Sequence, residues 1–176
     1  MTTSNTSGEV SAIQLREVQP SDLPIFFAQQ ADPIGYQMAA FTARDPSDQA
    51  AFMDHWAKIL VNPTSTIRTI VWQDQVVGNI LCFLWDGLPE VGYWLGRDYW
   101  GRGIATQALA ALLQIIPVRP LYAHAARDNH GSIRVLEKCG FRVTSYSSSW
   151  ANARGAEIEE AILELTAPPA AAVHTA

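Results

Sequence analysis

The chain has 176 residues, of which 48% are hydrophobic and 16% charged, and its formal net charge is −5. These proportions are typical of one globular domain with a sizeable core and exclude an intrinsically disordered chain. The only lysines are Lys58 and Lys138, so a broad basic surface for nucleic acid is not expected.

The two ends of the chain differ in composition from the segment between them. Residues 1–11 are mostly polar, without the charged-then-apolar pattern of a secretory signal, and residues 167–176 are rich in Ala and Pro. We expect both ends to be flexible and residues 12–166 to form the domain. No apolar run approaches the ~20 residues of a membrane span. We therefore expect a soluble cytoplasmic protein with no membrane partner and no nucleic-acid partner.

Hydrophobic periodicity predicts alternating strands and helices. Alternation of apolar and polar residues indicates strands, and apolar residues three or four apart indicate helices. The predicted elements, in chain order, are a strand at 12–18, a helix at 20–32, an aperiodic segment at 33–41, a helix at 45–63, a hairpin at 64–85, a strand at 89–96, a helix at 104–116, a strand at 120–126, a helix at 128–140 and a closing antiparallel pair at 141–150 and 157–166.

Polar residues before three of these helices are candidate N-caps. Ser21 and Ser47 are expected to cap the first two, and either Asp128 or Asn129 the last. The element order places long antiparallel runs around one strand-helix-strand crossover. It predicts an α/β fold built on a single mixed sheet.

The turn "GRDYWGRG" at 96–103 stands between a strand and a helix. Glycines there let an anion approach the unpaired N–H groups of the helix start, so the turn predicts a pyrophosphate cradle. A P-loop would need Lys and Ser or Thr where Arg102 and Gly103 stand. A dinucleotide fingerprint would need Gly or Ala where Thr106 stands. The ending Gly103-Ile104-Ala105 instead fits the G-x-G/A loop of acyl-CoA-binding acetyltransferases.

"GYWLGRDYWGRGIATQAL", followed about 25 residues later by "NHGSIRVLEKCGF", resembles the GNAT superfamily of N-acetyltransferases. The resemblance is strongest to its branch of RimJ- and RimL-like ribosomal-protein acetyltransferases, and it covers roughly residues 12–166. It implies the GNAT fold: a mixed, mostly antiparallel sheet of about seven strands with one central βαβα unit that binds acyl-CoA.

The resemblance also implies the residues that hold acetyl-CoA. Backbone amides at 102–106 would hold the pyrophosphate, two arginines would add charge, the end of the 89–96 strand would pair with the pantetheine arm, and residues of the 128–140 helix would contact it. Asn129 has the simpler alternative of a helix cap alone. The expected cofactor-binding residues are Trp94, Leu95, Arg97, Arg102, Gly103, Ile104, Ala105, Thr106, Asn129 and Ser132.

Transfer of an acetyl group to an amine needs a neutral amine, and therefore a base or prior loss of the proton to solvent. Glu90, at the head of the central strand, is the first candidate by family resemblance, and His124 is the second. Asp86 is a weaker one. Glu90 could equally be a solvated residue and His124 a core residue.

Many family members carry a Tyr seven residues after the motif Asn, and it protonates the leaving thiolate. Leu136 occupies that position here. Ser132, one turn earlier, is the expected substitute, and we expect positions 132 and 136 to share a face that looks toward the thioester. The simpler alternative for Ser132 is a polar residue in a first helical turn.

We expect the amine acceptor to contact apolar surface from Tyr36, Met38, Phe41 and Trp85, although core packing is an alternative for each. The predicted activity is N-acetyl transfer to a primary amine, with a peptide or protein N-terminus as the acceptor that the resemblance favours. The alternatives are a small-molecule N-acetyltransferase and a non-catalytic acyl-CoA-binding module. Cys82 and Cys139 are expected to be free thiols and no metal is expected. Monomer and homodimer both stay open.

Overall fold

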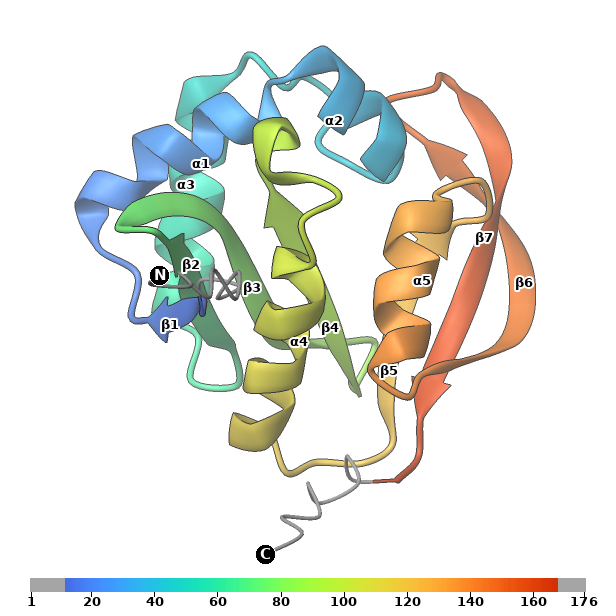
Figure 1. The fold of residues 1–176 in the computed structure, drawn as a ribbon. Coiled ribbons are helices and arrows are strands. Elements are labelled where there is room, and N and C mark those ends of the chain that lie inside the picture. The colour runs from blue at the N-terminus through green and yellow to red at the C-terminus, as the bar shows by residue number, and fades with distance from the viewer. Residues whose placement is uncertain (1–11, 168–176) are drawn as a thin grey trace, which may run out of the picture.

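A computed structural model describes residues 12–167, and the expectations for residues 1–11 and 168–176 lie outside it. The chain contains both strands and helices, which follow one another partly in groups (Figure 1). The elements are β1 (Gln14–Arg16), the short 3₁₀ helix η1 (Pro20–Asp22), α1 (Leu23–Gln30), α2 (Pro33–Ala39), α3 (Gln49–Leu60), β2 (Thr66–Trp72), β3 (Gln75–Trp85), β4 (Leu88–Leu95), the 3₁₀ helix η2 (Arg97–Tyr99), α4 (Ile104–Ile115), β5 (Leu121–Ala126), α5 (His130–Lys138), β6 (Arg142–Ala151) and β7 (Ala156–Leu165).

The strands form one seven-stranded sheet in the order β1-β2-β3-β4-β5-β7-β6. Every neighbouring pair is antiparallel except β4 and β5, which are parallel. Helix α4 makes the crossover that a parallel pair requires. The predicted α/β fold, with one mostly antiparallel sheet and a single crossover, is confirmed.

Helices cover both faces of the sheet. On one face, buried residues of α4 and α5 join those of β2 to β7 in the main core, to which Leu109, Leu112 and Leu136 belong. In Figure 1, α4 and α5 lie across the near side of the sheet. On the other face, α1 and α3 bury Phe26 and Trp56 in a second core, with ring centroids 5.0 Å apart.

Strands β4 and β5 separate soon after they meet. One register pair joins them in the described chain, Glu90 with Tyr122. Beyond it, β4 stays paired with β3 as far as Leu95, and β5 stays paired with β7 as far as Ala126. The sheet therefore forks between the carboxyl ends of β4 and β5.

Three local expectations were wrong. Ser21 lies inside η1 and does not cap α1. Asp48 rather than Ser47 caps α3, because its side chain accepts from the N–H of Ala51, while Ser47 bonds to Asp45. The aperiodic segment 33–41 contains a helix, α2, because the Asp32 side chain accepts from two N–H groups of its first turn.

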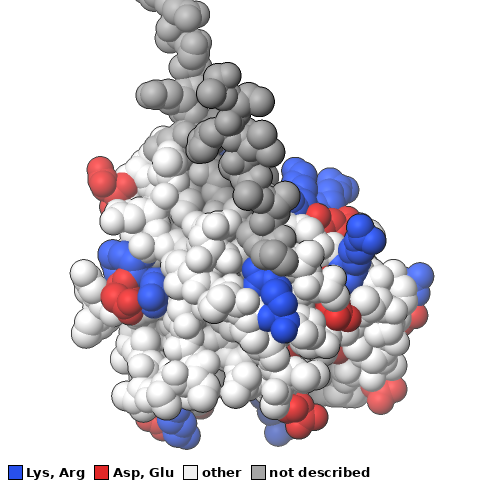
Figure 2. Space-filling view, turned by 90° about the horizontal axis from the view of Figure 1, so that it is seen from below, with Lys and Arg blue, Asp and Glu red and all other residues white. Residues whose placement is uncertain are grey.

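Charges of both signs are mixed over the surface. Figure 2 shows Lys and Arg side chains interleaved with Asp and Glu on the face seen from below. Among the described residues, no helix is both long and apolar enough to cross a membrane.

Asp22 connects three segments near the start of the sheet. Its side chain, 1% exposed, accepts from both terminal nitrogens of Arg16 at 2.6 and 2.9 Å, from the N–H of Gln19 and from the Thr69 hydroxyl at 2.7 Å. Burial opposes its charge, yet these four hydrogen bonds lower its pKa. Asp22 therefore ties η1 to β1 and β2.

We predict that Asp22→Ala lowers the free energy of unfolding by about 3 kcal/mol, because it leaves Arg16 and buried donors without a partner. The lowered pKa means that this stabilisation is present above about pH 4 and is lost as the pH falls through the folded-state value. Urea unfolding at pH 7 checks the loss. Asp54→Ala, on the exposed side of α3, is the control and should change stability by less than about 0.5 kcal/mol.

Candidate functional site

A cleft of about 620 Å³ opens at the fork. It is lined by the end of β4, the turn after it, the first turn of α4, one side of α5 and part of α2. Of the predicted cofactor-binding residues, those that line it are Trp94, Leu95, Gly103, Ile104, Ala105, Thr106, Asn129 and Ser132.

Helix α4 begins without a side-chain cap. Its N-cap is Gly103, whose φ of 76° lies in the left-handed region that favours glycine. The N–H groups of Ile104 and the two residues after it have no partner within the helix. A Cβ on Gly103 would meet no atom within 4 Å. Open space therefore adjoins the positive end of α4, and an anion fits there.

The two predicted arginines do not line this cleft. Arg97 pairs with Asp32, with Nε 3.2 Å from Oδ2. The guanidinium carbon of Arg102 lies 5.5 Å from the centre of the Trp72 ring. Both side chains thus brace the turn, one against the start of α2 and the other against β2.

The cationic side chains that line the cleft come from α5 instead. Arg134 and Lys138 line it, and neither forms a salt bridge with another residue in the described part of the chain. They are four residues apart and therefore share one side of the helix. This spacing was visible in the sequence, but the side of α5 that faces the cleft was not.

The side chain of Asn129 forms hydrogen bonds with two neighbouring segments. Its Oδ1 accepts from the N–H of Ser132 at 3.1 Å, which confirms one of the two predicted caps for α5. Its Nδ2 donates to the carbonyl of Met38 at 3.2 Å. Asn129 therefore joins α5 to α2 at the mouth of the fork.

The side chain of Ser132 meets a residue that sequence reasoning did not select. The hydroxyl oxygen of Tyr93, on β4, lies 2.8 Å from Ser132 Oγ. Both residues line the cleft. The expectation that position 136 shares this face was wrong: Leu136 is 1% exposed and belongs to the main core.

Glu90, His124 and Glu160 form a cluster on the face of the sheet opposite α4 and α5. His124 Nε2 lies 3.9 Å from Glu90 Oε2, and its Nδ1 lies 3.4 Å from Glu160 Oε1. The hydroxyls of Ser147 and Ser149 are 3.4 and 3.2 Å from the other Glu160 oxygen. Strands β4, β5, β7 and β6 thus build one polar row beside the fork.

The three charged groups of this cluster shift one another's pKa values. The hydrogen bond to Glu160 raises the pKa of His124, with help from both carboxylates and against burial. Burial raises the pKa of Glu90, although His124 opposes that shift. Burial disfavours the charge on Glu160, but hydrogen bonds from His124 and the two serines leave its pKa lowered. The three groups can therefore share a proton, which His124 holds more tightly than an isolated imidazole would.

The predicted acceptor residues are not brought together. The Tyr36 hydroxyl bonds to two carbonyls of the following loop. Phe41 packs against a small cluster that includes Ala126. Trp85, 64% exposed, ends β3. Met38, the fourth predicted acceptor residue, lines the cleft.

The cysteines are free thiols, as expected. Burial raises the pKa of both, so neither thiolate is favoured. No group of three or more candidate ligands that could hold a metal occurs in residues 12–167.

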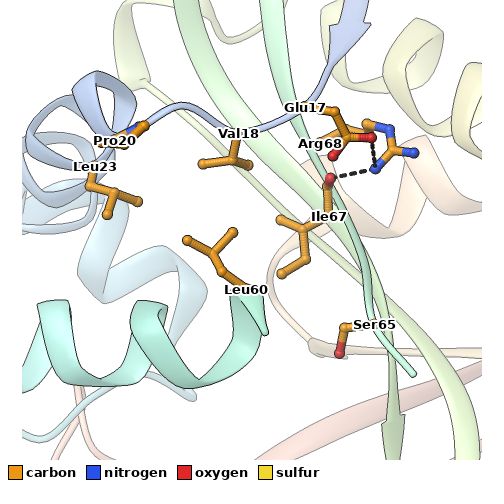
Figure 3. Close-up of a pocket in the computed structure, with 8 residues that line it drawn as sticks. All are labelled: Glu17, Val18, Pro20, Leu23, Leu60, Ser65, Ile67 and Arg68. Carbon is orange, nitrogen blue, oxygen red and sulfur yellow. Dashed lines mark hydrogen bonds and ion pairs between the residues drawn. The ribbon is translucent and has the colours of Figure 1, made fainter. Parts of the chain in front are cut away.

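A second cavity, of about 340 Å³, lies between the end of α3 and β2 (Figure 3). Its walls combine apolar side chains, including Val18, Leu60 and Ile67, with polar groups. Its two charged residues, Glu17 and Arg68, pair with each other at 3.0 Å. The fork, where several polar groups converge, is therefore the better candidate site.

Three comparisons relate the chain to known proteins. A family model described as an acetyltransferase (GNAT) domain matches residues 13–142. An uncharacterized N-acetyltransferase, p20, of Bacillus licheniformis is 28% identical over 93 residues, 49% of this chain and 52% of that protein. The match thus spans about half the length of that curated relative.

Two solved structures share the fold. The ribosomal-protein α-N-acetyltransferase RimL in complex with coenzyme A has a TM-score of 0.75 and 17% identity, over 90% of this chain and 96% of that one. Spermidine N-acetyltransferase from Vibrio cholerae, in complex with CoA and spermine, has a TM-score of 0.75 and 14% identity, over 88% and 95%.

We predict that Gly103→Asn weakens acetyl-CoA binding at least tenfold, or about 1.4 kcal/mol, because its side chain enters the open space at the start of α4. Asn tolerates a positive φ better than most residues. Gly155→Asn is the matched control, since Gly155 has a φ of 58° and equally open surroundings in the β6–β7 turn. Calorimetry on both folded variants checks this, and equal affinities would contradict it.

Proposed function

The chain belongs to the GNAT acetyltransferase family, and we propose that it transfers an acetyl group directly from acetyl-CoA to a primary amine. The observation that carries the proposal is the fork, with an anion-binding helix start on one side and the Glu90–His124–Glu160 cluster on the other. Acetyl-CoA supplies an activated acetyl thioester. The residues of the chain hold it, orient the amine and take up a proton.

The phosphates of acetyl-CoA would bind at the start of α4. The N–H groups of Ile104, Ala105 and Thr106 supply donors there, and Arg134 and Lys138 supply charge. Cys139 Sγ lies 3.6 Å from the carbonyl of Thr106, which brings the end of α5 close to this turn. This proximity supports a phosphate contact for Lys138.

The pantetheine arm would lie along the fork. Past Glu90, β4 has no register partner on its β5 side in the described chain, so its backbone can pair with the amides of an extended ligand. Ser132 and Lys138 are six residues apart on α5, which is roughly 9 Å along the helix at 1.5 Å per residue. Helix α5 would thus lie beside part of the arm between the phosphates and Ser132.

The cluster would receive the amine proton. Glu90 and His124 stand on either side of the fork, and the two carboxylates attract a cationic amine before it loses its proton. No cysteine thiolate is favoured, which supports direct transfer without a covalent enzyme intermediate. Glu90 and His124 interact, so we assign the base to the pair.

The acceptor that we propose is the α-amine of a peptide or protein. RimL, which shares the fold, is by its name an α-N-protein acetyltransferase. Trp85 is exposed on the β3–β4 hairpin, and it offers apolar contact for residues beyond the amine. The alternatives are a small amine, since the Vibrio cholerae protein is in complex with spermine, and acyl-CoA binding without turnover.

An acceptor panel separates these alternatives. CoA release from acetyl-CoA is measured with free and N-blocked peptides and with spermidine. Free peptides should give the highest kcat/KM, and Glu90→Gln should lower kcat about 100-fold while acetyl-CoA binding persists. A preference for spermidine would support the small-amine alternative. Binding of acetyl-CoA with no release by any amine would contradict the proposed enzyme.

The cluster also predicts a pH dependence. Activity should rise with pH as the protonated His124 and Glu90 pair releases its proton. Glu160 raises the pKa of His124, so Glu160→Gln lowers it and should move the acidic limb of the kcat/KM profile to lower pH. Glu159→Gln removes a neighbouring carboxylate that pairs with Arg127, and it should leave the limb in place. An unmoved limb in Glu160→Gln would reject the cluster as the base.

A further inference from the structure

Tyr93 and Ser132 meet across the cleft from different elements. Tyr93 comes from β4 and Ser132 from the first turn of α5. The phenol oxygen lies 2.8 Å from Ser132 Oγ and 3.2 Å from the Ser132 carbonyl oxygen. A side chain from the strand therefore fixes the position of a hydroxyl on the helix.

The phenol has one proton and two acceptors within reach. In one arrangement it donates to Ser132 Oγ, and the Ser132 proton stays free to point into the cleft. In the other arrangement the phenol donates to the Ser132 carbonyl, and the Ser132 hydroxyl donates its proton to the phenol oxygen. The 2.8 Å contact to Oγ occurs in both arrangements, and only the second also uses the longer contact of 3.2 Å to the carbonyl.

The environment of Tyr93 keeps it a donor. Burial raises its pKa to about 12, although the bond to Ser132 opposes that shift. The phenol therefore stays protonated at any pH at which the enzyme would work. An ionised Tyr93 would instead accept the Ser132 proton and turn it away from the cleft.

We propose that Tyr93 is a positioning residue that donates to Ser132 Oγ and thereby directs the Ser132 proton toward the sulfur that leaves acetyl-CoA. The inference rests on the proposed acetyl transfer. The amine nitrogen bonds to the acetyl carbon, the carbon–sulfur bond breaks and its electron pair goes to sulfur. The amine proton goes to the cluster, and Ser132 hydrogen-bonds the thiolate without giving up its proton. A thiol pKa near 8.5 lets the thiolate take its proton later from water.

Many family members carry a tyrosine at the position of Leu136, on the helix itself. Leu136 has no hydroxyl and lies in the core. A tyrosine hydroxyl reaches the first turn of α5 from the neighbouring strand instead.

A double-mutant cycle tests the inference. Tyr93→Phe keeps the ring and removes only the hydroxyl, so single-turnover acetyl transfer should slow by about fivefold, the scale of one neutral hydrogen bond. Ser132→Ala should slow it by roughly 10- to 100-fold. The double variant should be no slower than Ser132→Ala, because Tyr93 acts only through Ser132. Calorimetric acetyl-CoA affinity and thermal unfolding should stay close to wild type in Tyr93→Phe.

Other outcomes overturn the inference. Fully additive losses, or a weakened acetyl-CoA affinity in Tyr93→Phe, would mean a structural role. An unchanged or faster Tyr93→Phe would select the second arrangement. Tyr146→Phe, on exposed β6, is the control and should match wild type. If wild type itself transfers no acetyl group, the proposed function fails; if only the Tyr93 result fails, acetyl transfer stands without this residue.

Discussion

The loss of pairing between β4 and β5 after Glu90 is the constraint on which the candidate site depends. A continuous sheet would use the backbone groups of both strands on each other. Here each strand keeps its outer partner, β3 or β7, and the inner groups remain available to a ligand. The same divergence gives α4 and α5 separate starting points and leaves room between them for the cleft.

Charge is divided between the two faces of the fork, although the chain as a whole is acidic. The start of α4, Arg134 and Lys138 make one side favourable to anions. Glu90 and Glu160 make the other side favourable to cations, with His124 between them. An anionic acetyl donor and a cationic amine would each meet the opposite charge on its own side. The proposed site would therefore separate its two substrates electrostatically.

Sequence reasoning was most successful where a local rule decides the structure. The glycine turn at the start of α4 was identified, and the cap of α5 was narrowed to Asp128 or Asn129, because both follow from turn and capping chemistry. The predicted Ser47 cap failed because the neighbouring Asp48 accepts from the first turn of α3. The predicted Ser21 cap failed because Ser21 lies inside η1, which leads into α1 without a side-chain cap. Helix α2 was missed because seven residues with one Gly show too little periodicity.

Contacts between distant segments were beyond such rules. Tyr93 meets Ser132 across 39 residues, and only the packing of α5 on the sheet decides that position 136 faces inward. His124 was identified as a candidate base, but its partner Glu160 depends on β7 lying between β5 and β6. The arginines of the turn were assigned to phosphate by family resemblance, whereas in the structure they contact Asp32 and Trp72.

The fork also means that this sheet has four edges rather than two, and unpaired edges invite other chains to add strands. The outer edges are poor templates for an added strand, because β1 has three residues and the pairing of β6 is irregular between Val143 and Ser145. The inner edges, residues 91–95 of β4 and 123–126 of β5, are short. Helices α2, α4 and α5 line the cleft beside them. A second polypeptide strand would have to fit its side chains among these helices, whereas a slender ligand would not. Open strand edges usually promote aggregation, but here the inner edges lie inside a cleft that would admit a slender ligand.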